Sequence, residues 1–83
     1  EKLGAAITYA DQTLSQLQEM AQSFGPDPSR WPPEQKQRFM AVAQRAMLEM
    51  DQAINFAYKK VEDVPPEISA KLAELAQAMN AAQ

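Results

Sequence analysis

The first 24 residues carry apolar side chains at alternating steps of four and three. These positions are Leu3, Ile7, Ala10, Leu14, Leu17, Ala21 and Phe24. A period of 3.5 residues is typical of an amphipathic helix that packs along its whole length. The pattern predicts a helix over residues 2–24, roughly 34 Å long at 1.5 Å per residue. Gly25-Pro26 is expected to end it, because Gly suits the left-handed residue after a helix and Pro cannot continue one.

The middle of the chain carries two apolar stripes instead of one. The first stripe is Met40, Ala43, Met47, Met50, Ile54, Ala57 and Val61, and the second is Phe39, Val42, Ala46, Ala53 and Phe56. Together they predict a long helix over residues 32–62 with an apolar face wider than one neighbouring helix needs. Such a helix contacts two neighbours in its own chain, or one neighbour in the chain and another chain outside it.

A shorter pattern follows Pro65-Pro66, a pair that suits the first turn of a helix. Its apolar positions are Ile68, Leu72, Leu75, Met79 and Ala82, and they predict a third helix over residues 65–82. Residues 1–83 are therefore expected to form a single all-α domain, an up-down-up three-helix bundle with a long central helix. The central helix would overhang its neighbours, and a second copy of the chain in a two-fold homodimer would cover the overhang.

Composition and charge exclude most chemistry. The 83 residues include no Cys and no His, so the chain cannot form a disulfide, a Cys-based metal site, or a Ser-His-Asp or Cys-His catalytic site. Eight Lys and Arg against 11 Asp and Glu give a net charge of -3 without a basic cluster, which argues against nucleic-acid binding. We expect no enzyme, no cofactor and no metal, and no apolar run is long enough to span a membrane.

Two features allow both a structural and a binding interpretation. Trp31 lies in a short connection, where it could fold over the end of a helical hairpin or serve as an exposed anchor for a partner. The five methionines could fill the core or line an adaptable groove. The candidate protein-binding residues are Trp31, Phe39, Met40, Met47, Met50, Ile54 and Phe56, chosen by apolar type and spacing alone.

Three function classes follow from these observations. The first is a protein-interaction module (an adaptor, assembly subunit or inhibitor) that binds another protein or a helical segment through apolar helix surface. The second is a small helical chaperone for unfolded or secreted clients. The third is an amphipathic membrane-surface binder, a class that favours basic polar faces, whereas the polar faces here are mixed and slightly acidic.

The chaperone alternative rests on the methionines and on one short motif. Pro33-Glu34-Gln35 at a helix start resembles the Leu-Thr-x-x-Gln boxes of envelope-stress helical chaperones. Trp31-Pro32 stands where that family has Leu-Thr, and the second proline pair, Pro65-Pro66, is followed by Glu67-Ile68 without the Gln. The resemblance covers a handful of residues and assigns the chain to no family.

Overall fold

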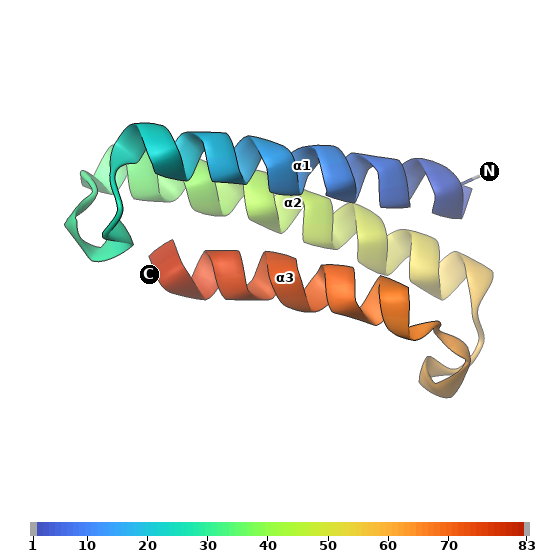
Figure 1. Cartoon of the computed structure of the whole chain (residues 1–83). Helices are drawn as coiled ribbons and strands as arrows, with labels where there is room; N and C mark the ends of the chain where they lie inside the picture. Colours follow the sequence, from blue (N-terminus) through green and yellow to red (C-terminus); the bar gives the residue numbers. More distant parts are fainter. Residues whose placement is uncertain (1, 83) are drawn as a thin grey trace.

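The computed structural model describes residues 2–82 and consists of three α-helices connected by two short 3-10 turns. The helices are α1 (Lys2–Phe24), α2 (Pro33–Ala57) and α3 (Pro66–Ala82), and the turns are η1 (Pro28–Arg30) and η2 (Val61–Asp63). All three helices pack against one another (Figure 1). No strand occurs in the described part of the chain, so the prediction of an all-helical three-helix fold is confirmed.

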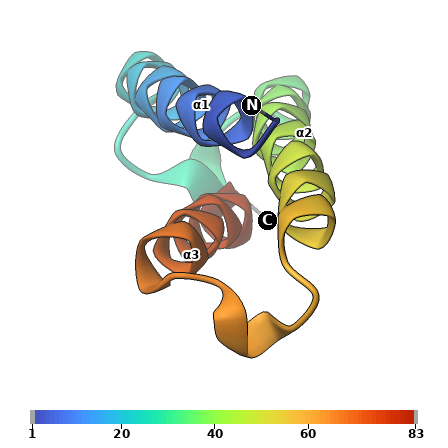
Figure 2. The same ribbon diagram turned by 90° about the vertical axis from the view of Figure 1, so that its right-hand side faces the viewer.

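α2 is the central element of the bundle. Seen from the end, the three helices lie at the corners of a triangle (Figure 2), and α2 makes more extensive contacts with α1 and with α3 than those two make with each other. The two apolar stripes of α2 are explained by this arrangement, because one side of its apolar face meets α1 and the other meets α3. The molecule measures 40 × 20 × 17 Å.

The end of α1 agrees with the prediction. Gly25 adopts a φ of 124°, a backbone angle that residues with a side chain rarely adopt. Its N–H donates to the carbonyl oxygen of Ala21 at 3.0 Å. Asp27 then caps η1, because its Oδ1 accepts hydrogen bonds from the backbone N–H and the hydroxyl of Ser29 at 3.2 and 2.7 Å. The connection between α1 and α2 is therefore fixed by its own hydrogen bonds.

The end of α2 differs from the prediction. The helix was expected to reach residue 62, but it ends at Ala57, where Tyr58 turns extended (φ -127°, ψ 138°) while its N–H still bonds the carbonyl of Ile54. A helix to residue 62 would have left only residues 63–64 to cross to the third helix, at the short limit of helix–helix connections. The structure uses residues 58–65 instead, and Val61, expected to continue the apolar stripe, is 89% exposed in η2.

Alanine makes up half of the buried apolar residues. The core comprises Ala6, Ala10, Leu17, Trp31, Phe39, Ala43, Ala46, Met50, Ala53, Ile68, Leu75 and Ala82. Five of these six alanines lie on α1 and α2, and such small side chains allow two helices to approach closely. Thr13 is also buried, which the apolar pattern did not predict because threonine is polar.

One ion pair connects the first helix with the third. Lys71 Nζ of α3 donates to Asp11 Oδ1 of α1, across 60 residues of sequence. Both side chains remain partly in contact with solvent. The pair adds a polar contact to α1 and α3, which share the least extensive of the three helix contacts.

Candidate interaction surface

The seven candidate binding residues occupy three different environments. Trp31, Phe39 and Met50 are buried in the core. Met40, Met47 and Ile54 are half-buried and pack against that core. Phe56 alone among the seven is exposed, at 75%. The structure therefore places most of the predicted set inside the fold of one chain and leaves Phe56 on its surface.

Trp31 covers the loop end of the α1–α2 hairpin. Its ring lies edge-on to Phe24 and Phe39, with centroids 5.3 and 5.0 Å apart. Its Nε1 donates a hydrogen bond to the carbonyl oxygen of Gly25 at 3.0 Å. A buried indole with its N–H bonded is a structural arrangement, although an edge of Trp31 lines a shallow pocket beside Gly25 and Pro26.

The methionines also pack inward. Met50 is fully buried, and Met20, Met40, Met47 and Met79 are half-buried against the core. Their flexible side chains fill the irregular spaces between helices, as methionine does in many cores. All five are thus buried or half-buried, and Met20 lines a groove beside Phe24 and Val42.

Three large apolar side chains are exposed in the described part of the chain. Leu48 is 57% exposed, Phe56 75% and Val61 89%. Leu48 and Phe56 lie on the same side of α2, eight residues apart, whereas Val61 lies in η2. The signal for Leu48 was present in the sequence, since it falls outside both apolar stripes and among charged residues, but a lone exposed leucine is common and carries little weight.

The exposed side of α2 that carries Leu48 and Phe56 is here named the outer face of α2. Its residues are Arg38, Arg45, Leu48, Glu49, Gln52 and Phe56, all exposed and spaced three, four or seven residues apart. Residues with this spacing lie on one side of a helix. The outer face thus combines two large apolar side chains with charges of both signs.

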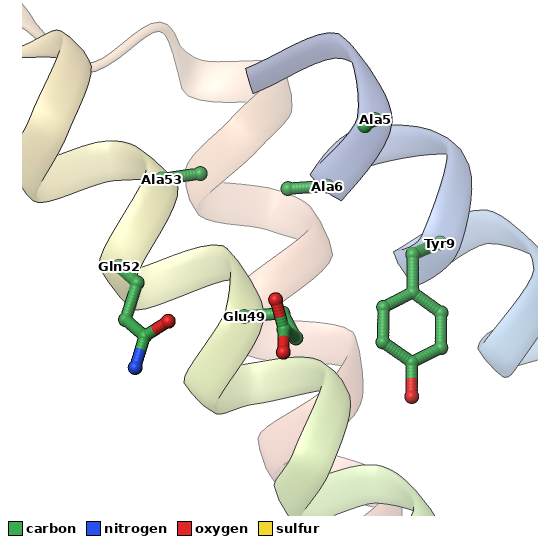
Figure 3. Close-up of a pocket in the computed structure, with 6 residues that line it drawn as sticks. All are labelled: Ala5, Ala6, Tyr9, Glu49, Gln52 and Ala53. Atoms are coloured by element: carbon green, nitrogen blue, oxygen red, sulfur yellow. The ribbon is translucent and has the colours of Figure 1, made fainter. Parts of the chain in front are cut away.

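A groove between α1 and α2 adjoins this face. It has a volume of about 220 Å³ and is lined by Ala5, Ala6, Tyr9, Glu49, Gln52 and Ala53. Figure 3 shows Ala6 and Ala53 facing each other across the two helices, with Glu49 on the side of α2 that is turned toward Tyr9. Because Glu49 and Gln52 line the groove and also belong to the outer face of α2, the two features form one surface.

A second groove, of about 240 Å³, lies between the end of α2, the connection that contains η2, and the start of α3. Ile54, Tyr58, Val64 and Leu72 supply its apolar lining, and Lys59 and Lys60 supply positive charge. Asp51 also lines it, so its charge is mixed. Val61 lines this groove as well. It therefore belongs to a different surface from the outer face of α2.

The described residues carry no further chemical site of these kinds. Within residues 2–82, no three or more Asp and Glu side chains gather in a way that could hold a metal ion. The helices of the described region are too short or too polar to cross a membrane. No protein-family model, curated protein or solved structure matches the chain.

Proposed function

We propose that the chain is a non-enzymatic protein-interaction module, an assembly subunit that acts as a two-fold homodimer through the outer face of α2. The helices of each copy follow an up-down-up order. The observation that carries the proposal is the exposure of Leu48 and Phe56 on one side of a helix whose opposite side packs into the core.

The spacing of Leu48 and Phe56 supports a helical partner. The two residues are eight positions apart on α2, which corresponds to about 12 Å along the axis. An amphipathic helix laid along α2 would contact both, in the manner of other helix-in-groove complexes. Single exposed apolar residues are normal on protein surfaces, but an aromatic and a leucine on the same helix side, beside an alanine-lined groove, resemble the apolar centre of an interface.

The charges of the surface support a protein partner over other classes. The outer face of α2 carries Arg38 and Arg45 together with Glu49, so it has charges of both signs. A phosphate-rich partner would instead call for a clearly basic patch, and a membrane surface would call for basic residues flanking a continuous apolar face. Mixed charges around apolar residues are typical of the rim and centre of protein–protein contacts.

The test is the mass in solution, measured by light scattering after size exclusion over a concentration series. The wild-type chain should approach twice its mass of 9.2 kDa as the concentration rises. Leu48→Gln and Phe56→Ser should each return it to the monomer without loss of helicity, because both side chains are exposed in the single chain.

Val61→Ser is the matched control. It also replaces a large exposed apolar residue, but one in η2 and outside the outer face of α2, so it should leave the mass unchanged. A wild-type chain that stays at 9.2 kDa at the highest concentration would contradict the proposal. A control variant that dissociates as fully as the two test variants would contradict the choice of surface.

A further inference from the structure

We propose that the two copies pair α2 against α2 in antiparallel orientation, with the two-fold axis level with Met47. This inference rests on the homodimer proposed above and adds its register. In such a pair, residues that are equally far before and after Met47 lie opposite each other. The outer face of α2 is complementary to itself in this arrangement.

The charged residues at the centre of the face determine the register. Arg45 lies two positions before Met47 and Glu49 two positions after it. Each Arg45 therefore faces the partner's Glu49, and the symmetry repeats the contact, which gives two interchain ion pairs around the axis. Complementary charges of this kind fix register and orientation in helical pairs.

The apolar residues fit the same register. Arg38 lies nine positions before Met47 and Phe56 nine after it, so each guanidinium comes to lie over the partner's phenyl ring, a favourable contact of cation and aromatic face. Leu48 is one position from the axis, and the two Leu48 side chains are thus offset by only about 3 Å along the helices. Both exposed apolar residues of α2 are covered.

Neighbouring registers place like charges together. An axis at Arg45 sets that residue against its own copy, and an axis at Glu49 does the same for the two glutamates. A parallel pair, with its axis along the helices, sets every residue of the face against its copy. Like charges directly opposed across an interface are unfavourable, and the antiparallel pair centred on Met47 avoids them while also placing Phe56 opposite Arg38.

The register sets the length of the interface. α2 ends ten residues after Met47, so residues 37–57 of each copy overlap, over roughly 30 Å. A stable interface needs about 800 Å² on each partner. That area corresponds to about one seventh of the 5765 Å² of accessible surface of one copy.

The decisive experiment mixes two variants that cannot pair with themselves. Arg45→Glu leaves only acidic groups at positions 45 and 49, and Glu49→Arg leaves only basic ones. Each variant alone should have a dimer dissociation constant at least about tenfold above wild type. A 1:1 mixture should form a heterodimer, in which both ion pairs are restored, and the double variant with both substitutions should form a homodimer like wild type.

The same residues could also pair within one helix, since they are spaced i, i+4. Such an internal pair predicts no preference for the mixture, so a mixture that stays as monomeric as its components would overturn the register. A wild-type chain that is itself monomeric would instead overturn the homodimer, and the two failures are thereby separated. A dimeric wild type whose Arg45→Glu variant is equally dimeric also overturns the register.

A disulfide offers an independent measurement, because the chain has no Cys of its own. Leu48→Cys places the two new thiols next to the axis, and mild oxidation should convert most of the protein to a covalent dimer. Asn55→Cys, an exposed position of the same helix, places them about 24 Å apart along the axis and should stay reduced. Equal cross-linking of the two variants would overturn the proposed alignment.

Discussion

Trp31 Nε1 donates a hydrogen bond to the carbonyl oxygen of Gly25 at 3.0 Å. The acceptor directly follows α1, and the donor stands two residues before α2 begins. One side chain thus connects the end of one helix to the start of the next, and its ring contacts with Phe24 and Phe39 join both helices to it. The hairpin depends on this cluster because the rest of its interface is rich in alanine.

Replacement of Trp31 should therefore be costly. Trp31→Ala removes a side chain that is only 4% exposed, and we expect a loss of about 3–5 kcal/mol in the free energy of unfolding. Trp31→Phe keeps an aromatic ring but leaves the Gly25 carbonyl without its donor, for a loss of about 1–3 kcal/mol. Urea unfolding followed by far-UV circular dichroism measures both losses. A Trp31→Ala variant as stable as wild type would contradict the conclusion that Trp31 holds the two helices together.

The two glycines of the chain should respond in opposite directions to alanine. Gly25→Ala forces a φ of 124° on a residue with a Cβ, and we expect a loss of about 1–2 kcal/mol. The Cβ itself would meet only Trp31 Nε1, at 3.8 Å, so the backbone conformation is the cause. Gly4 lies within α1 with open space around it, and Gly4→Ala should stabilise by about 0.5–1 kcal/mol.

Thermal unfolding of both variants checks this pair. The midpoint should fall for Gly25→Ala and rise for Gly4→Ala. A rise for both would show that residue 25 is not held in the left-handed region in solution.

The Asp11–Lys71 ion pair should contribute little. Its side chains are 55% and 25% exposed, and ion pairs that solvent reaches contribute about 0–1 kcal/mol. Lys71→Met should thus change the free energy of unfolding by less than about 1 kcal/mol, and the difference from wild type should shrink in about 1 M salt. Urea titrations at low and high salt measure it, and a large loss that salt does not reduce would mean that Lys71 acts through packing.

The local pattern was sufficient to predict α1. Its three-four spacing and the Gly25-Pro26 stop lie within the segment itself, so nothing from the rest of the chain is needed to place its ends. The all-helical class followed in the same way from the period of each apolar stripe. The fate of Trp31 required the structure, because a tryptophan between two helices fits a cover and an anchor equally well.

The end of α2 and the exposure of Phe56 could not be read from local pattern. Val61 continues the spacing of the stripe, and residues 58–62 contain neither Gly nor Pro, so only the need to cross to α3 ends the helix. Phe56 belongs to the same stripe as Phe39, Ala46 and Ala53, all three of which are buried. Ala6, near the start of α1, lies opposite Ala53 (Figure 3). One turn beyond Ala53, α2 passes the first residues of α1, so little of α1 is left to cover Phe56.

Because the contact between α1 and α2 is rich in alanine, the α1–α2 hairpin is held more tightly at its loop end than at its open end. Each buried alanine offers one methyl group and no interlocking shape, whereas Trp31 and its two aromatic neighbours fix the loop end firmly. The open end of the hairpin consists of the first turn of α1 and the last turn of α2, and the groove lined by Ala5, Ala6 and Ala53 lies next to it. A small change in the distance between these two ends would therefore widen or narrow the groove, while the ring contacts of Trp31 would keep the loop end of the hairpin closed.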